Sequence, residues 1–298
     1  MRAVTVSEFG GPEKVEITEH PTPTPGSGQV RIKVRAAALN PVDVAMRTGV
    51  FGGNGQPIGL GFDVAGTVDA VGSNAGFSVG DRVFGLATGH NKKLGTHADY
   101  VVLDAQAVAH SPADLSDLEA GSLPLNTLTA MQALDYLGLK TGQRLLITGA
   151  AGGVGSHATE LAHYRGIVVT GLDRSSTEDF VRARGAQEFC STVSEIPSKS
   201  FDGVFDTAVL GSQVLDTIHD AGSYVGLWPG QEPSAVREIA VKAMGVRADH
   251  NQLAEIAQLA DRGVLLPRVA KTFALADAAS AHACLAEGRL PGRILLVP

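Results

Sequence analysis

The stretch that decides the fold is LLITGAAGGVGSHATELA, residues 145–162. A short apolar run ends in a cluster of small residues, and a helical pattern follows directly. Within the cluster, Ala150, Gly152 and Gly155 occupy the three places of a G-x-G-x-x-G fingerprint, with alanine in the first. The first place turns the chain out of the strand, the second admits a pyrophosphate against the backbone, and the third lets helix and strand pack closely. The stretch therefore predicts a dinucleotide site that opens a βαβ unit.

The same loop is expected to supply the phosphate contacts. A helix that begins at Gly153 directs its free N–H groups and the positive end of its dipole toward the phosphates. Small residues alone could form a purely structural turn, but the strand before them and the helix after them favour nucleotide binding. The predicted contacts with the cofactor are Ala150, Ala151, Gly152, Gly153 and Val154.

The end of the next apolar strand, IVVTGL (167–172), is where the ribose of the cofactor is expected. Asp173 follows roughly 20 residues after the loop, the place of an acid that binds the ribose of NAD. Arg174 and Ser175 come next, and they would instead bind the 2′-phosphate of NADPH. Because the strand runs to Leu172, Asp173 stands one place late for the ribose. NADPH is therefore favoured over NADH, with a solvated turn as the alternative role of Asp173.

Changes in composition along the chain predict three parts. Residues 1–115 carry most of the prolines and short alternating runs, the pattern of a compact all-β unit. Residues 116–267 open with a capping box of Ser116 and Glu119 and then alternate strands with helices, which predicts a doubly wound parallel sheet. Residues 268–298 end with a helix and a strand that we expect to return to the N-terminal part. The predicted fold class is α/β, with a Rossmann sheet inserted in a mostly-β domain.

The middle part has near-continuous apolar runs, as expected of parallel strands that are covered on both faces. These runs are RLLIT (144–148), IVVTGL (167–172), GVFDTAV (203–209) and SYVGLW (223–228). The predicted helices between and after them are TEDFVRARG (177–185), SQVLDTIHD (212–220) and SAVREIAVKAMG (234–245).

Composition excludes several classes of function. The chain has 298 residues, of which 44% are hydrophobic and 18% charged, so it can bury a sizeable core. A net charge of −7 without a cluster of Lys and Arg argues against nucleic-acid and anionic-membrane partners. No signal peptide or membrane span of about 20 apolar residues is visible. Cys190 and Cys284 lack the spacing of a metal site and predict no disulfide framework. We expect a cytoplasmic protein with a small-molecule substrate.

Seven stretches together resemble one family in order and spacing. They are MRAVTVSEFGGPE (1–13), ALNPVDVAMRTG (38–49), GFDVAGTVDAVG (61–72), GDRVFGL (80–86), LPLNTLTAMQAL (123–134), AAGGVG (150–155) and GRLPGRILLVP (288–298). The chain resembles the medium-chain dehydrogenase/reductase superfamily, specifically its zinc-free quinone oxidoreductase (zeta-crystallin-like) branch, over nearly its whole length. The resemblance implies a GroES-like substrate domain interrupted by the Rossmann domain, with the active site in the cleft between them. It also implies a homodimer that pairs through the edge of the nucleotide-binding sheet.

The resemblance accounts for a lack of zinc ligands. Zinc-dependent relatives place Cys, His and Cys where this chain has Asn40, Phe62 and Leu125. These three residues supply no good ligand for zinc, so no metal is predicted. Without a Lewis acid, the expected reaction is hydride transfer from a reduced nicotinamide to an acceptor that is already polarised, a quinone or an α,β-unsaturated carbonyl compound.

Three residues of the N-terminal part are candidate catalytic residues. The resemblance places Asn40 beside the nicotinamide, where its amide could donate to a developing oxyanion; opening a turn is its alternative role. Asp43 would orient this group or cap the following helix. In the loop GLATGHNKKLGTHADY (85–100), His90 or His97 could act as general acid, and His97 could equally pack as a wall of the site.

The resemblance adds two cofactor contacts and leaves the proton donor open. Thr129 would reach the nicotinamide with its hydroxyl, or else bond only within its own helix. Arg293 would lie near the cofactor, or else form an exposed salt bridge. Several relatives carry a tyrosine suspected of donating the proton in enone reduction where this chain has Ala45. The alternative functions are therefore a pathway-specific enoyl or ketone reductase of secondary metabolism and a non-catalytic NADPH-binding sensor.

Overall fold

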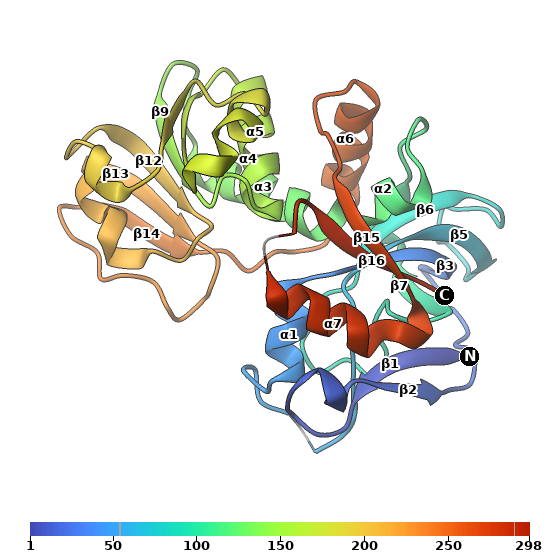
Figure 1. Cartoon of the computed structure of the whole chain (residues 1–298). Coiled ribbons are helices and arrows are strands. Elements are labelled where there is room, and N and C mark those ends of the chain that lie inside the picture. The colour runs from blue at the N-terminus through green and yellow to red at the C-terminus, as the bar shows by residue number, and fades with distance from the viewer. Residues whose placement is uncertain (54, 289) are drawn as a thin grey trace. The chain divides into compact units, whose positions relative to one another are not determined.

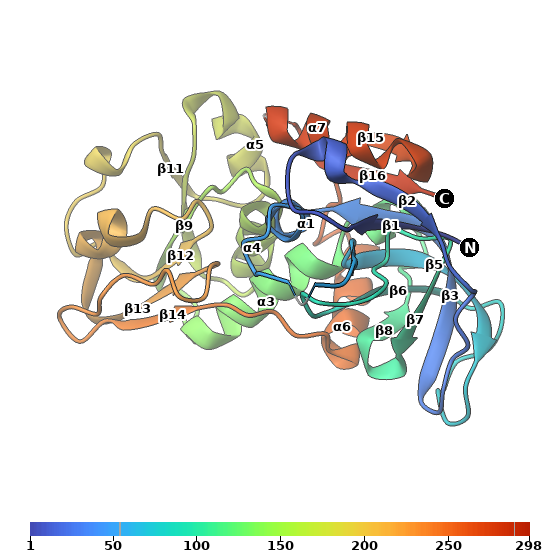
Figure 2. The same ribbon diagram turned by 90° about the horizontal axis from the view of Figure 1, so that it is seen from below.

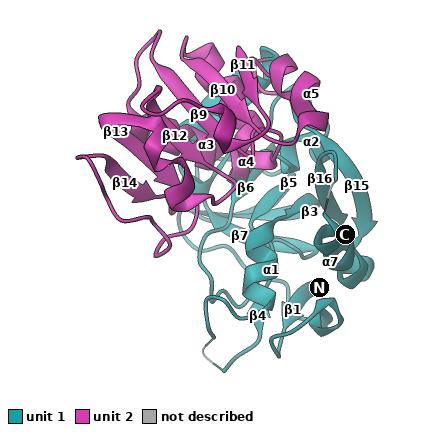
Figure 3. Ribbon diagram, turned by 60° about the vertical axis from the view of Figure 1, so that its left-hand side comes forward, with its two compact units in different colours: residues 1–125, 248–263, 267–298 teal, residues 126–247, 264–266 magenta. Residues whose placement is uncertain are grey.

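Residues 1–53, 55–288 and 290–298 are described by a computed structural model of the chain. They form two compact units, shown in two colours in Figure 3. Unit 1 comprises residues 1–125, 248–263 and 267–298, and unit 2 comprises residues 126–247 and 264–266. Within the described residues, no helix is both long and apolar enough to cross a membrane.

Unit 1 is built on two sheets in which the strand pairs are antiparallel, except for the parallel pair β15–β16. A small sheet has the strand order β2-β1-β4, and a larger one has the order β15-β16-β3-β5-β6-β8, with β7 also paired to β3. The strands are β1 (Arg2–Val6), β2 (Glu16–Glu19), β3 (Gln29–Leu39), β4 (Ile58–Gly59), β5 (Asp63–Val71), β6 (Arg82–Leu86), β7 (Tyr100–Asp104), β8 (Val108–His110), β15 (Val269–Ala274) and β16 (Arg293–Val297). The helices are α1 (Pro41–Arg47), α2 (Asp117–Gly121), α6 (His250–Asp261) and α7 (Ala278–Glu287).

The alternating pattern of the N-terminal part produces this core. In β3 the side chains of Val30, Ile32 and Val34 are buried, and they join Val64 and Val68 of β5 in one apolar cluster. Each alternate residue faces outward, which is the expected result of the two-residue period of a strand. The strands expected from the alternating runs of residues 1–115 are therefore confirmed for β3, β5 and β6.

The C-terminal residues complete the sheet that the N-terminal residues begin. Strand β16 pairs antiparallel with β3, in a register that sets Ile294 opposite Leu39. Strand β15 runs parallel to β16, and α7 makes the crossover between them. Figures 1 and 2 show these red elements next to the blue strands of the same unit.

Helices α2 and α6 lie within residues 116–267, the predicted middle part, but they belong to unit 1. The capping box that opens α2 is confirmed, because the Ser116 N–H donates to Glu119 at 2.9 Å and the Glu119 N–H donates to the Ser116 hydroxyl at 3.3 Å. Helix α2 packs on β3 and β5, and α6 packs on β8. The ring of His250 bonds the Val108 carbonyl at 2.6 Å, which ties α6 to the antiparallel sheet.

Unit 2 is a parallel sheet with the strand order β11-β10-β9-β12-β13-β14. The strands are β9 (Arg144–Thr148), β10 (Val168–Leu172), β11 (Glu188–Cys190), β12 (Phe201–Asp206), β13 (Ile218–Gly226) and β14 (Ala240–Ala243). Helices α4 (Gly153–Tyr164) and α5 (Glu178–Ala183) lie in this unit, as does α3 (Pro124–Leu137) from Asn126 onward. An order that grows outward in both directions from β9 is that of a Rossmann sheet, so the predicted fold class is confirmed.

Two predicted helices of the middle part are wrong. Residues 212–220 form a short 3-10 turn (Gly211–Thr217), and β13 begins at Ile218. Residues 234–245 contain the edge strand β14, in which Val241 and Ala243 face inward and their neighbours are exposed. Short apolar patterns of this kind satisfy both a helical and an alternating period, and pairing with β13 decides the outcome.

Candidate functional site

The fingerprint loop of unit 2 has the backbone geometry of a phosphate site. Gly149 leaves β9 with φ +61°, a left-handed conformation that favours glycine. A Cβ on Gly155 would lie 2.2 Å from the Gly149 carbonyl oxygen, so loop and helix approach too closely for any side chain there. Gly152 is the N-cap of α4 and makes no side-chain cap, which leaves the first-turn amides available to an anion. The loop residues therefore fit the pyrophosphate of a dinucleotide.

Asp173 and Arg174, which follow β10 and are predicted to bind the ribose or its 2′-phosphate, differ in how far their side chains are exposed. The Asp173 carboxylate accepts the N–H of Ala151 at 2.9 Å and that of Arg174 at 2.7 Å. Its side chain is 12% exposed, whereas that of Arg174 is 64% exposed. Asp173 thus ties the fingerprint loop to β10, while Arg174 and the exposed Ser175 extend into solvent, where a 2′-phosphate could meet them. Thr129 is buried in α3 of the same unit.

A second centre lies in unit 1, around the fully buried carboxylate of Asp63. Its Oδ1 accepts the backbone N–H of Leu125 at 2.5 Å, and its Oδ2 accepts the side-chain amide of Asn40 at 2.8 Å. The Arg293 guanidinium lies 3.5 Å from Oδ2 and also donates to the amide oxygen of Asn40. Burial raises the pKa of Asp63 to about 6, although Arg293 and Asn40 both favour its charged form. We call Asn40, Asp63 and Arg293 the Asp63 network.

These contacts alter the roles expected for two residues. Both amide hydrogens of Asn40 have protein acceptors, the Ala38 carbonyl at 3.3 Å and Asp63. The arrangement therefore does not support donation from this amide to a substrate oxygen. The Arg293 guanidinium is 11% exposed, so its ion pair with Asp63 is buried and is not the exposed salt bridge expected as the alternative; its contact with the cofactor stays a prediction.

Asp43 and His97 make hydrogen bonds with the backbone at and next to Asn40. The buried Asp43 carboxylate accepts the N–H of Asn40 at 2.9 Å and that of Gly61 at 2.7 Å, which is an orienting and capping role. The His97 ring bonds the Ala38 carbonyl at 3.1 Å through Nε2, and its Nδ1 has no partner among the described residues. Burial lowers the pKa of His97. The fully buried ring therefore fits a packed wall better than a general acid.

We expect the buried His282 of α7 to make the free energy of unfolding depend on pH. It is fully buried, both ring nitrogens lack partners among the described residues, and burial lowers its pKa to about 4. The unfolded chain, with an ordinary pKa of roughly 6.5, binds this proton first as the pH falls. The stabilising contribution is therefore complete above about pH 6.5 and disappears toward pH 4.

We expect His282→Leu to reduce this pH dependence. Between pH 7.5 and pH 5.0 the wild type should lose roughly 2 kcal/mol more free energy of unfolding than the variant. Urea unfolding at the two pH values measures the difference. Equal losses in the two proteins would show that His282 does not cause the dependence.

Lys92 is a functional candidate that the sequence patterns did not single out. Its Nζ lies 3.3 Å from the centroid of the Phe62 ring and donates to the Ala87 carbonyl at 3.3 Å. Burial lowers the pKa of Lys92 to about 8, and the charges of Asp43 and Asp63 oppose this shift. The sequence signal is a pair of lysines, Lys92 and Lys93, in the same loop as His90 and His97.

The side chains at the zinc-ligand positions do not fit a zinc ion. The amide nitrogen of Asn40 donates to Asp63, and its amide oxygen accepts from Arg293. The Phe62 ring is covered by the ammonium group of Lys92. Leu125 contributes only a backbone N–H, which repels a cation. Asp63 alone has the chemistry of a zinc ligand, and Arg293 already balances its charge. Across the part of the chain that the structure describes, no three His, Cys, Asp or Glu side chains are grouped to hold a metal.

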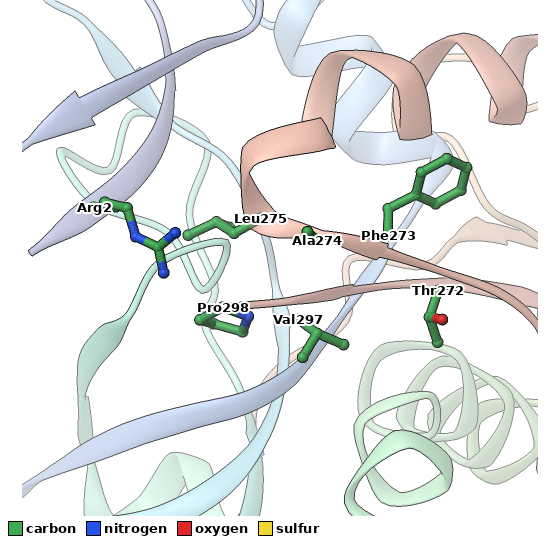
Figure 4. Close-up of a pocket in the computed structure, with 7 residues that line it drawn as sticks. All are labelled: Arg2, Thr272, Phe273, Ala274, Leu275, Val297 and Pro298. Carbon is green, nitrogen blue, oxygen red and sulfur yellow. The ribbon is translucent and has the colours of Figure 1, made fainter.

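A pocket of about 380 Å³ elsewhere in unit 1 is a weaker candidate (Figure 4). It is lined by β15, the end of β16 and Arg2. The Arg2 guanidinium is paired with Asp99 at 2.7 Å, and the remaining lining is mostly aliphatic. We therefore take the fingerprint loop of unit 2 and the Asp63 network of unit 1 as two candidate sites, each described by itself.

Comparisons with known proteins give consistent matches. Residues 26–113 match the family described as "Alcohol dehydrogenase GroES-like domain", and residues 173–296 match "Zinc-binding dehydrogenase". The chain is 30% identical to a 2-methylene-furan-3-one reductase of Solanum lycopersicum, over 100% of this chain and 79% of that protein. It is also 30% identical to a quinone oxidoreductase of Pseudomonas aeruginosa, over 100% and 99% of the two chains. A solved structure described as an NAD-dependent alcohol dehydrogenase superposes with a TM-score of 0.86 at 31% identity, covering 100% of both chains.

Proposed function

Because the chain belongs to the medium-chain dehydrogenase/reductase superfamily, in its quinone oxidoreductase branch, we propose that it is a zinc-independent, NADPH-dependent reductase of quinones or α,β-unsaturated carbonyl compounds. The observation that carries the proposal is the Asp63 network. In the structure Asp63 accepts hydrogen bonds from two of the zinc-ligand positions, the side-chain amide of Asn40 and the backbone N–H of Leu125, and it pairs with the Arg293 guanidinium. The names of the quinone and enone reductases among the relatives support the same class of acceptor.

Unit 2 would hold the cofactor, which when bound supplies a hydride from its reduced nicotinamide. The backbone of Ala150 to Val154 would bind the pyrophosphate, with the loop held in place by the bond between Ala151 and Asp173. Arg174 and Ser175 would bind the 2′-phosphate, because both are exposed beside the loop and Arg174 carries the charge. The inward contacts of Asp173 leave its carboxylate poorly placed for a ribose, which favours NADPH over the NAD named for one relative.

Unit 1 would hold the hydride acceptor without activating it by a metal. The Asp63 network contains one carboxylate and one guanidinium, so it presents a rigid surface with little net charge. Such a surface offers no Lewis acid to polarise a simple ketone or to stabilise an alkoxide. An acceptor that is already electrophilic, such as a quinone or a conjugated carbonyl compound, can accept the hydride without being polarised by a Lewis acid.

A panel of acceptors tests the proposal. The purified protein is mixed with NADPH or NADH and with 9,10-phenanthrenequinone, 1,4-quinones, small enones and simple ketones, while the absorbance of the reduced nicotinamide is followed. We expect turnover with quinones or enones, a preference for NADPH, and no turnover with simple ketones. Tight binding of NADPH without oxidation by any acceptor would instead identify a sensor. Turnover of ketones alone would overturn the proposed class of acceptor.

A further inference from the structure

Lys92 is held in one place by contacts on its backbone and on its side chain. Its carbonyl oxygen accepts the N–H of Gly59 at 2.8 Å, which fixes residue 92 against β4. Its ammonium group rests on the face of Phe62, 3.3 Å from the ring centroid, and donates to Ala87. A cation on an aromatic face is stabilised by the ring quadrupole while most of its hydration is lost. The group is thus positioned at the residue that replaces the zinc-binding histidine of relatives.

Two buried carboxylates of unit 1 act on the charge of Lys92. Asp43 on α1 and Asp63 on β5 attract the ammonium, and Arg293 on β16 balances Asp63. On the same loop, the pKa of His90 is lowered by burial and by Lys92, and its ring stacks on Phe51. His97 is buried and its pKa is also lowered. Lys92 therefore carries a proton at neutral pH and releases it more readily than an ordinary lysine, since its pKa is lowered to about 8.

We propose that Lys92 is the proton donor in the reduction of α,β-unsaturated carbonyl compounds, an inference that rests on the proposed function. The hydride adds to the β-carbon, the C=C electron pair moves toward the carbonyl, and an enolate results. The Lys92 Nζ–H bond then breaks, and its proton forms the new bond at the α-carbon. The products are the saturated carbonyl compound, the oxidised nicotinamide and a neutral amine, which regains its proton from water. This role fills the place left open by Ala45.

The proposal separates the two classes of acceptor. An enolate is a strong base at carbon and is protonated slowly without a positioned acid. Reduced quinones carry their charge on weakly basic oxygens, which take protons directly from water. Loss of Lys92 should therefore slow enone reduction far more than quinone reduction.

The experiment compares Lys92→Met, which keeps an unbranched apolar side chain against Phe62, with Lys93→Met at the exposed neighbouring position. We expect kcat for a small enone to fall by about 100-fold in Lys92→Met, and kcat for 9,10-phenanthrenequinone to change by less than about threefold. Lys93→Met should match the wild type on both acceptors. Lys92→Gln serves as a second variant, and thermal unfolding shows that each protein is folded.

Two pH measurements complete the test. The enone rate of the wild type should fall above pH 8, as Lys92 loses its proton, and this fall should be absent from Lys92→Met. Independently of turnover, the rate at which Lys92 is acylated, followed by peptide mass spectrometry, should rise with a midpoint near pH 8.

The outcomes separate the two proposals. Equal losses on enone and quinone, or an alkaline fall that persists in Lys92→Met, would overturn the role of Lys92 while leaving the proposed function intact. A wild-type protein that oxidises NADPH with neither acceptor would overturn the proposed function and this inference together.

Discussion

Replacing Arg293 by methionine should destabilise the protein by about 3 kcal/mol, because it leaves the buried carboxylate of Asp63 without its counterion. Loss of one partner of a buried pair costs far more than the pair itself contributes, since the remaining charge has no water around it. Urea unfolding at pH 7.5 measures the loss. Arg82→Met is the matched control, because Arg82 forms a largely exposed pair with Asp117 and should cost less than about 1 kcal/mol.

The double variant Asp63→Asn/Arg293→Met makes the same prediction sharper. With no charge left to desolvate, it should recover most of the stability that Arg293→Met loses. The sign of the pH dependence follows from Asp63, whose pKa in the folded protein is already raised to about 6. Without Arg293 this pKa rises further, so the deficit of the single variant should shrink as the pH falls and Asp63 is protonated. A deficit no larger than that of Arg82→Met would show that the network does not hold a buried charge pair.

Replacing Arg174 by alanine should weaken the binding of NADPH by about 100-fold and leave that of NADH nearly unchanged. A charge-assisted contact with a phosphate is worth roughly 2–3 kcal/mol, and only NADPH carries the 2′-phosphate. Arg182→Ala is the control, because Arg182 is also an arginine of unit 2 with one ion pair, to Glu178 at 2.8 Å, as Arg174 has one to Asp173 at 3.7 Å, but it does not follow β10. Titration of the intrinsic fluorescence of the wild type and of both variants with each nucleotide gives the dissociation constants to be compared. Equal losses for both cofactors would assign Arg174 a structural role and return the ribose to Asp173.

The nucleotide-binding half was predictable because its signals are local. Strand, turn and helix follow one another within residues 145–162. The spacing of the small residues predicts that loop and helix approach closely at Gly155. Strands β9 and β10 could be predicted for the same reason. The edge strand β14 could not, because an exposed and weakly apolar segment becomes a strand only through pairing with β13.

The centre in unit 1 was only partly predictable. The resemblance pointed to Asn40 and Arg293, but their partner Asp63 and the N–H of Leu125 come from distant parts of the chain. No periodicity predicts which buried group will bond which. Lys92 was missed because its burial depends on how its loop folds over Phe62. Patterns in sequence predict elements, whereas a site built by tertiary contacts requires the packed structure.

The rate of NADPH oxidation by the metal-stripped protein, with 9,10-phenanthrenequinone as acceptor, tests whether the reaction needs a metal ion. Asn40, Phe62 and Leu125 stand at the zinc-ligand positions, and their side chains do not fit the ion. We therefore expect the rate after dialysis against a strong chelator to stay within about twofold of the untreated rate, with no increase on adding Zn²⁺. Activity that disappears on stripping and returns with Zn²⁺ would contradict the account.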